Sequence, residues 1–440
     1  IEQTNKNNAL FPILLVNFMG TLGFSIVMPF LVFLVTQFGG NAIIYGIIGA
    51  VYPFFQLFGA PILGKWSDIY GRKKILFLSQ AGTVAGWLIF LASAIVPLTV
   101  LLSFDTTLLG VFSITIPLIF VFAARAIDGL TGGNISVANA YLADITDEKN
   151  RNRNFGKMSV SSNLGFIAGP AIAGLLGSTS YGYVVPIVAA LALSGITLVL
   201  IQFYLPDTGV KQYTEKPDDI KKVLGFENKE CFKIEGEKNI PKAKILDIPN
   251  IKFIFVIYFL IFLAFNFYYT SFPVHAIEKL GWTVGEMGIY FSVLSVLMVI
   301  VQGPLLSRLA KKVSESVLII TGNLLLVVTF LLLLSGNTIL VFSSAVFFAA
   351  GNGIMWPSVL SVLSKAAGKT FQGAVQGYAS SLGSLASIIG LVLGGIIYSN
   401  LGTFTFVISA SVIFLVAVLS FRFPAVLREC PVNVPDLKTN

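Results

Sequence analysis

Long apolar runs dominate this sequence and limit what it can fold into. About 20 apolar residues in a row cross the hydrocarbon core of a bilayer as an α-helix. Of the 440 residues, 55% are hydrophobic and 11% are charged, whereas soluble domains carry about a quarter charged residues. The chain is therefore a polytopic membrane protein, and its spans must be helical because irregular backbone facing lipid leaves N–H and C=O groups unsatisfied. The runs predict twelve helices: 10–37, 42–63, 74–101, 108–145, 154–178, 180–205, 250–276, 283–306, 313–335, 338–364, 371–398 and 401–423.

One long polar segment interrupts the apolar pattern. Residues 206–249 are rich in Lys, Glu, Asp and Pro, a composition that cannot bury enough apolar surface to form a core. We interpret this segment as a cytoplasmic linker. It divides the chain into an N-terminal six-helix half (1–205) and a C-terminal six-helix half (250–423), followed by a cytoplasmic tail (424–440). Both termini are then expected on the cytoplasmic side.

The basic residues are sorted by side of the membrane. The chain has 29 Lys and Arg against 21 Asp and Glu, a net charge of +8. Nearly all the basic residues fall in segments that the predicted spans place on one side, as expected because cytoplasmic segments carry the Lys/Arg excess. The exceptions are Lys279, on the other side, and Arg125, inside a span. The positive charge therefore indicates membrane orientation and does not indicate nucleic-acid binding.

The stretch from Gly64 to Lys74, G-K-W-S-D-I-Y-G-R-K-K, is a short cationic connection between two predicted spans. Gly64 and Gly71 permit a tight turn and a close approach of the backbone. Arg72 and Lys73 mark the cytoplasmic side. The sequence therefore predicts a loop over 64–74.

An acid stands among these cations. Asp68 is placed to pair with them or to cap a helix, and Asp144, near the end of the fourth predicted helix, is a further candidate partner for Arg72. A degenerate copy of the stretch, G-P-L-L-S-R-L-A-K-K at 303–312, follows the eighth predicted helix. It keeps the cations but has Ser307 in place of the acid. We therefore expect the acid-bearing ion cluster in the N-terminal half.

One charged pair lies inside a predicted span. A charge near the middle of a bilayer is costly and marks function by default. Asp128 is the only acid in the apolar part of any predicted span, and it follows Arg125 at the i,i+3 spacing that places both on one helix face. Two interpretations stay open: an ion pair that locks the fourth helix, and a switch in which Asp128 binds and releases a proton. In the second, burial favours the protonated carboxyl and Arg125 favours the ionised one.

Three stretches together resemble the major facilitator superfamily and, within it, the tetracycline-efflux-like branch of the drug:proton antiporters. They are 64–74, the run R-A-I-D-G-L-T-G-G-N from Arg125 with its exit A-Y-L-A-D-I-T-D at 140–147, and G-F-I-A-G-P-A-I-A-G at 165–174. The resemblance covers nearly the whole chain except the linker and the tails. It implies an all-α membrane protein with twelve transmembrane helices in two six-helix repeats, which transports by alternating access.

The resemblance also implies roles for particular residues. It implies that Arg125 takes part in proton coupling, and that the pairing of Asp144 with Arg72 stabilises one conformational state. It associates the glycine–proline run with antiporters, which favours export over uptake. Small residues let helices approach closely and proline favours a bend. The implied gating motif comprises Gly64, Asp68, Gly71, Arg72, Lys73 and Asp144, and the implied antiporter motif comprises Gly165, Gly169, Pro170 and Gly174.

One position departs from the resemblance. Tetracycline-type antiporters are similar to this chain around I-V-M-P-F at 26–30, but they carry an acid in the first helix at the position that is Gly20 here. The first predicted helix contains no acid at all. If the chain couples to protons, Asp128 must take over this work, or the coupling differs. The departure also leaves room for a carrier that is not driven by protons.

Polar and aromatic side chains in the predicted helices are candidates for a substrate site. Asn266 and the tyrosines beside it form a polar-edged aromatic wall suited to a flat amphipathic ligand. Aromatic side chains in membrane helices more often serve packing, and each lone polar residue more often bonds another helix. The candidates are Asn17, Gln56, Asn134, Asn266, Tyr268, Tyr269, Asn352, Trp356 and Gln376.

The sequence contains no motif of an enzyme. It has no Cys or His in metal-ligand spacing, no nucleophile elbow and no P-loop. We therefore expect no enzyme activity, no metal and no cofactor, and an ATP-driven pump is disfavoured. A receptor or scaffold is disfavoured by the paired halves and the intramembrane charges.

The sequence favours a secondary active transporter. We predict a proton-coupled antiporter that exports small amphipathic compounds or drugs, with protons, the substrate and membrane lipid as its partners. We expect a monomer in a bacterial inner membrane. The alternative is a proton-coupled or facilitative carrier of an organic anion or metabolite, in which Arg125 binds the substrate.

Overall fold

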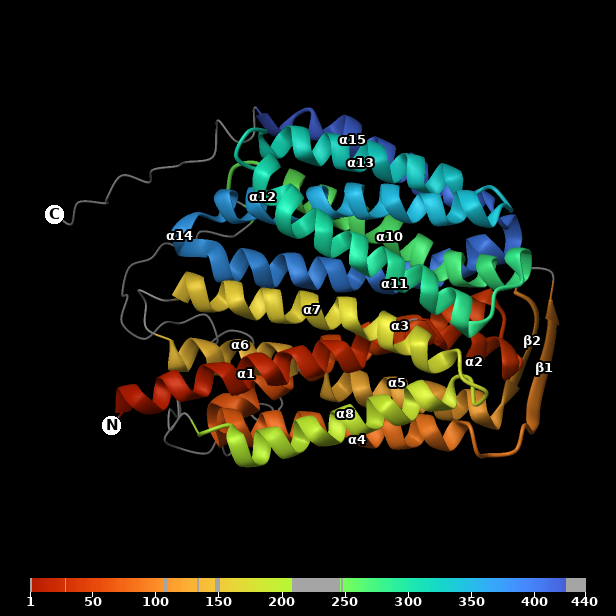
Figure 1. Cartoon of the computed structure of the whole chain (residues 1–440), viewed down its shortest axis with the longest axis horizontal. Coiled ribbons are helices and arrows are strands. Elements are labelled where there is room, and N and C mark those ends of the chain that lie inside the picture. Colours follow the sequence, from red (N-terminus) through yellow and green to blue (C-terminus); the bar gives the residue numbers. More distant parts are fainter. Residues whose placement is uncertain are drawn as a thin grey trace. The chain divides into compact units, whose positions relative to one another are not determined.

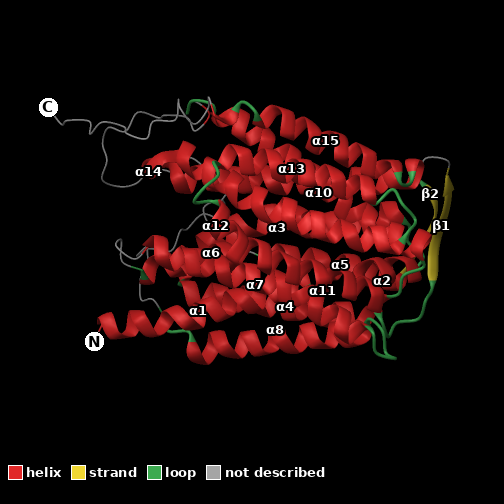
Figure 2. Cartoon of the chain, turned by 45° about the horizontal axis from the view of Figure 1, so that its top comes forward, coloured by secondary structure: helices red, strands yellow, loops and turns green. Residues whose placement is uncertain are grey.

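The computed structural model describes almost all of the apolar chain. The described backbone is overwhelmingly helical, with one two-stranded sheet (Figure 2). It covers residues 2–27, 29–106, 109–132, 134–146, 151–207, 246 and 248–424, of which the side chains of 2–8, 134–135, 151–153 and 368–374 are not described.

Contacts between residues divide the chain into two units. Unit 1 contains the described residues within 1–235 together with Trp282–Ser292. Its elements appear in Figure 1: α1 (Glu2–Ser25), α2 (Leu31–Gln37), α3 (Ala42–Tyr70), α4 (Arg72–Ser93), β1 (Val100–Thr106), β2 (Gly110–Thr115), α5 (Ile116–Thr131), α6 (Asn134–Ile145), α7 (Arg151–Gly177), α8 (Val184–Tyr204) and the beginning of α11 (Val284–Ile300).

Unit 2 contains the described residues within 236–281 and 293–440. The end of α11 passes there into a π-helical turn that includes Gly303 and Pro304. Proline has no N–H to donate to the helix ladder, and wide turns of this kind interrupt α-helices at such places. The elements are α10 (Ile251–Leu280), the end of α11, the π-helix Val301–Leu305, α12 (Leu306–Leu309), α13 (Glu315–Leu332), α14 (Thr338–Leu401) and α15 (Phe404–Ser420).

The described helices account for all twelve predicted apolar runs. Ten segments are long and apolar enough to cross a membrane, and two shorter apolar helices, Ala9–Ser25 and Phe404–Ser420, occupy the first and last positions. Helices α5 and α6 together form one of these spans, and α14 contains two, Thr338–Ala367 and Val375–Leu401. The chain is therefore a multi-pass membrane protein of the all-α class, as predicted.

The first predicted helix is interrupted. Helix α1 ends at Ser25 and α2 begins at Leu31, whereas the sequence predicts one helix over 10–37. Pro29 lies in the interruption. Since proline cannot donate a backbone hydrogen bond and its ring crowds the preceding turn, the helix stops before it.

The connection between α3 and α4 is much shorter than predicted. The expected loop over 64–74 is wrong, because α3 continues to Tyr70 and α4 begins at Arg72. Gly71 alone connects them, with φ of +98°, a conformation that costs glycine least. Gly64 lies inside α3, and none of the described residues approaches the place where a Cβ would be, so the expected close backbone approach is absent among them.

The third and fourth predicted helices are also corrected. Helix α4 ends at Ser93 and α5 begins at Ile116, whereas the sequence predicts helix to 101 and from 108. Strands β1 and β2 form an antiparallel hairpin between them. The intervening residues are rich in Val, Phe and Thr, which favour strands. The side chain of Thr115 then caps α5 by accepting a hydrogen bond from the N–H of Leu118.

Candidate functional site

The predicted charge pair lies on α5 inside unit 1. Arg125 Nη1 is 3.6 Å from Asp128 Oδ2, at the i,i+3 spacing expected from the sequence. The two side chains are only 6% and 16% exposed. The pair is therefore shielded from solvent. In such a buried environment an uncompensated charge would be costly.

Aromatic rings hold the guanidinium. The Cζ atom of Arg125 lies 4.8 Å from the ring centre of Tyr52 on α3 and 5.7 Å from that of Phe24 on α1, distances at which a cation is attracted by an aromatic face. Asp128 accepts a hydrogen bond from the Thr83 hydroxyl on α4. Four helices thus fix the pair, and its position does not depend on α5 alone.

A cavity of about 170 Å³ adjoins the pair within unit 1. Asp128 forms part of its wall, and Gly20 of α1 lies on the same wall. A second cavity of about 10 Å³ touches both Arg125 and Asp128, which is close to the space that one water needs. The larger cavity is lined by Gly20, Thr21, Gly23, Phe24, Tyr52, Gln56, Gln80, Thr83, Trp87, Asp128, Gly132, Phe166 and Ser194.

Hydrogen bonds orient the two amide side chains of the larger cavity. Gln56 Nε2 donates to the Tyr52 hydroxyl at 3.1 Å and to the Gly132 carbonyl at 2.9 Å. Gln80 Nε2 donates to the Ser194 carbonyl at 3.1 Å. These bonds use both donors of Gln56 and one donor of Gln80, and they leave the two amide oxygens as acceptors. Together with the carboxylate of Asp128, they make a wall suited to hold a proton or a hydrogen-bond donor.

The buried Nε atom of Arg125 has no hydrogen-bond partner among the described atoms. Buried polar atoms are normally satisfied by protein or by ordered water. The small second cavity beside Arg125 offers room for one such water.

The second predicted ion cluster lies where α3, α4 and α6 end or begin. Arg72 Nε donates to Asp144 Oδ2 at 2.8 Å, which is the predicted pairing. Arg72 also forms an ion pair with Asp68 and donates to the Ser67 hydroxyl at 2.6 Å. The Arg72 side chain is 5% exposed, so one buried guanidinium joins three helices at this end of unit 1.

The glycines of α7 face two different helices. A Cβ at Gly165 would lie 2.7 Å from the Phe18 carbonyl of α1, and the Gly165 carbonyl accepts a hydrogen bond from the Ser25 hydroxyl at 3.0 Å. Gly169 faces α1 in the same way, whereas Gly174 faces Gly288 of α11. The predicted close helix approach is present, and it serves both contacts because small residues allow backbones to meet.

The predicted substrate residues of unit 1 lie in different environments. Gln56 lies on the cavity wall. Asn17 instead joins α1 to α7, because its Nδ2 donates to the Met158 carbonyl at 3.1 Å and to the Ser162 hydroxyl at 2.7 Å. The side chain of Asn134 lies outside the described residues.

The remaining predicted substrate residues belong to unit 2. Asn266 joins α10 to α14 through a 3.1 Å bond to the Ser387 hydroxyl. The buried Oδ1 of Asn352 has no partner among the described atoms. The aromatic members pack against other rings, Tyr268 beside Tyr269, Phe272, Phe330 and Phe348, and Trp356 beside Tyr258 and Phe262, while Gln376 is half-buried on α14.

Sequence reasoning missed several residues that the structure brings to Asp128. Gln80 and Thr83 on α4 are polar positions inside an apolar run, and that signal alone could have singled them out. Phe24 and Tyr52 carried no such signal, because their role beside Arg125 depends on how α1 and α3 pack against α5. Gly20 was noted only for the acid it lacks, and the structure adds that it faces the same cavity.

A helical membrane fold with a charge pair and a polar cavity inside one unit is typical of membrane transporters. The chain belongs to the Major Facilitator Superfamily, whose family model matches residues 13–313 and 254–438.

Curated relatives resemble the chain over most of its length. The class D tetracycline resistance protein of Salmonella ordonez is 27% identical over 390 residues, covering 88% of this chain and 89% of the relative. Multidrug resistance protein 2 of Bacillus subtilis (strain 168) is 27% identical over 405 residues, covering 90% of each.

Solved structures agree in fold. A D-xylose-proton symporter matches with a TM-score of 0.71 and 14% identity over 94% of this chain and 98% of that one. A human organic anion transporter matches with a TM-score of 0.63 and 18% identity over 94% of this chain and 99% of that one. The transporter fold extends over almost the whole described chain.

Proposed function

We propose that this transporter is a proton-coupled antiporter that exports small amphipathic compounds by alternating access, with Asp128 as the site that takes up and releases the proton. The observation that carries the proposal is the position of Asp128. Its carboxylate pairs with the buried Arg125 and at the same time lines a polar cavity of about 170 Å³. Intramembrane acids that face a water-accessible cavity serve as proton relays.

Two further observations support export coupled to protons. The relatives that match most of the chain include proteins named for tetracycline resistance and multidrug resistance. Gly20, where tetracycline-type antiporters carry an acid, lines the same cavity as Asp128. The carboxylate on α5 therefore reaches the space that a helix-one acid would reach.

The proposal also covers the oligomeric state of the protein, its membrane and its orientation. It acts as a monomer in a bacterial inner membrane, with both termini in the cytoplasm. The cluster of Arg72, Asp68 and Asp144 holds one conformational state, and the division into two six-helix halves joined by the 206–249 linker provides the two bodies that alternate. Internally repeated transporters work in this way.

Transport in proteoliposomes tests the role of Asp128. With an imposed pH gradient, Asp128→Asn is expected to abolish gradient-driven drug transport while downhill exchange persists. Asp105→Asn is the matched control, since it removes an exposed carboxylate that does not line the cavity. Adding Gly20→Asp to the Asp128→Asn protein should restore part of the gradient-driven transport. Unchanged gradient-driven transport in Asp128→Asn would refute the assignment.

A second function, a carrier of organic anions, is favoured by one observation. The Nε atom of Arg125 is buried without a partner among the described atoms, and a substrate carboxylate is a natural partner for a guanidinium. Against it, the cavity that touches Arg125 measures only about 10 Å³. Arg125→Lys separates the two functions, because a lysine loses bidentate binding but keeps the charge. Weakened anion affinity supports the carrier, and retained affinity with lost coupling supports the antiporter.

A further inference from the structure

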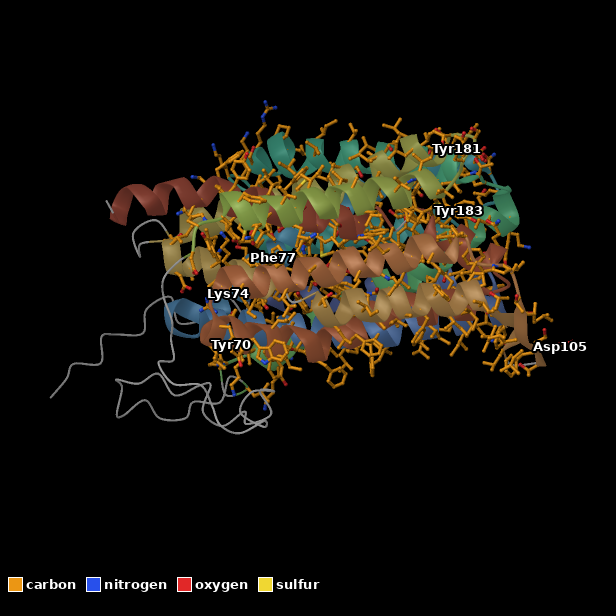
Figure 3. The ribbon with its side chains drawn as sticks, turned by 90° about the horizontal axis from the view of Figure 1, so that it is seen from below. Tyr70, Lys74, Phe77, Asp105, Tyr181 and Tyr183 are labelled. Carbon is orange, nitrogen blue, oxygen red and sulfur yellow. The ribbon has the colours of Figure 1, made fainter. Side chains whose placement is uncertain are left out.

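The hairpin of β1 and β2 lies at one end of unit 1. Figure 3 places Asp105 and Tyr181 at this end, and Tyr70 and Lys74 at the opposite end. In Figure 1 the two strands run across the axes of α4 and α5. Because those helices cross the membrane, the hairpin lies roughly parallel to the membrane plane.

One edge of the hairpin is fixed to the body of unit 1. The N–H of Ser113 donates to the Gly39 carbonyl at 2.8 Å, and the Thr115 hydroxyl donates to the Phe38 carbonyl at 2.7 Å. Asn41 Nδ2 donates to the Leu109 carbonyl at 2.8 Å. These bonds hold β2 on the turn between α2 and α3. They leave β1 as the outer strand, and all of its residues are exposed.

The two faces of the hairpin differ in polarity. Leu102 pairs with Ile114 and Phe104 pairs with Phe112, and the two phenyl rings stack at 5.0 Å. Because side chains alternate along a strand, the opposite face carries Ser103 with Ser113, whose hydroxyls lie 3.1 Å apart, and Asp105 with Val111. The face with Leu102 and Phe104 is therefore the more apolar of the two, and Leu102 on it is 56% exposed.

The exposed apolar surface of the hairpin continues that of the helices beside it. Leu88 on α4 is 52% exposed, and Ile95 and Leu98 lead from it into β1 with 77% and 60% exposed. Ile119 and Phe122 are exposed on α5, directly after β2. Outward apolar side chains of membrane helices face lipid, so the hairpin extends a lipid-facing surface. Asp105 is the only charged residue within 95–116.

We propose that strands β1 and β2 are a lipid-binding element that lies at the boundary between headgroups and acyl chains. Leu102 and Phe104 face the acyl chains, and Ser103 and Asp105 face water. The outer edge of β1 has no partner strand among the described residues. It sets this depth, because its N–H and C=O groups find no partners in hydrocarbon but find water and headgroups at the boundary. An exposed apolar patch of this kind marks a membrane or protein contact, and the lipid-facing surface beside it identifies the membrane.

Spin labelling measures the depth of the two faces. Leu102→Cys and Ser103→Cys are adjacent positions on opposite faces, made singly in protein whose Cys231 and Cys430 are serine. Each carries a nitroxide, in full-length protein in phosphatidylcholine vesicles. We expect the label at 102 to show a several-fold higher ratio of oxygen to nickel-chelate accessibility than the label at 103. Equal exposure of both labels to the nickel chelate would overturn the proposal.

The same labels test pairing with a second copy of this chain. The free edge of β1 is also a template for strand addition. Dipolar broadening of the label at 102, removed by dilution with unlabelled protein, would assign the edge to a second copy and overturn the lipid proposal. Unbroadened spectra with the depth difference above would support it. Neither result depends on whether Asp128 carries the proton, so the antiport proposal stands or falls separately.

Discussion

The two units hold an ion pair at corresponding helices, but with the charges exchanged. In unit 1 the cation, Arg72, begins α4 and its acid, Asp144, ends α6. In unit 2 the acid, Glu315, begins α13 and its cation, Lys365, lies near the end of the first span of α14. In chain order these are the third and fourth helices of each predicted half. The duplicated architecture thus keeps the place of the contact and reverses its sign.

The two pairs also differ in burial. Arg72 and Asp144 are 5% and 13% exposed, whereas Lys365 and Glu315 are 53% and 28% exposed. Arg72 has Asp68 and Ser67 as further partners, while Glu315 accepts from Ser361 at 3.3 Å. Position alone therefore does not decide what such a pair contributes. Burial and the number of partners decide the contribution of a pair to stability. Exposed ion pairs contribute little, whereas a buried charge that loses its partner is costly.

Loss of Arg72 is expected to have the largest effect. Arg72→Met leaves Asp68 and Asp144 without their cation, and breaking a buried pair costs about 3–5 kcal/mol. Thermal or denaturant-induced unfolding of the purified protein in detergent measures the loss of stability. Lys365→Met is the matched control in unit 2. Equal losses in the two variants would show that burial does not separate the two pairs.

Neutralising one acid of unit 1 should have a smaller effect. Asp144→Asn weakens a charge-assisted hydrogen bond to Arg72 Nε, an interaction worth about 1.5–3 kcal/mol. Asp68→Asn should cost less, because Asp68 is 26% exposed against 13% for Asp144. The same unfolding measurement ranks the two. A larger loss for Asp68→Asn would make Asp68 the principal partner of Arg72.

The pair of unit 2 should have the smallest effect. Lys365→Met removes an exposed pair and is expected to cost less than about 1 kcal/mol. The double variant Glu315→Lys with Lys365→Glu, which gives unit 2 the charge order of unit 1, should unfold like the unmodified protein. Unfolding at low ionic strength and at about 1 M salt, where the screening length is about 3 Å, checks the exposure. A loss of stability above about 1 kcal/mol that does not change with salt would contradict the exposed, weak character of this pair.

Charge and hydropathy predicted the parts of the fold that depend on composition. The apolar runs located the spans because crossing a bilayer leaves few alternatives. The i,i+3 spacing of Arg125 and Asp128 predicted their pairing, and Asp144 was matched to Arg72 correctly. The pair of Glu315 and Lys365 was not predicted, because it lies outside the copy of the 64–74 stretch. That copy lost its acid at Ser307, while the acid of the pair begins the next helix.

The remaining features depend on packing that local patterns do not encode. The sequence of 100–115 is as apolar as a span, and the structure adds the hydrogen bonds to Phe38 and Gly39 that hold β2 against the rest of unit 1. The cavity beside Asp128 gathers side chains from six helices. Asn17 was a substrate candidate with a bond to another helix as the alternative, and its partners Met158 and Ser162 come within reach because α1 packs on α7.

The single residue between α3 and α4 restricts how unit 1 can move. Gly71 is the whole connection, and consecutive Cα atoms are fixed about 3.8 Å apart. The connection therefore cannot lengthen, and neither helix can slide along its axis without pulling the other. A conformational change that shifts α3 must carry α4 and the buried Arg72 with it. The two helices therefore move together, and a lengthened connection at Gly71 would uncouple their movements.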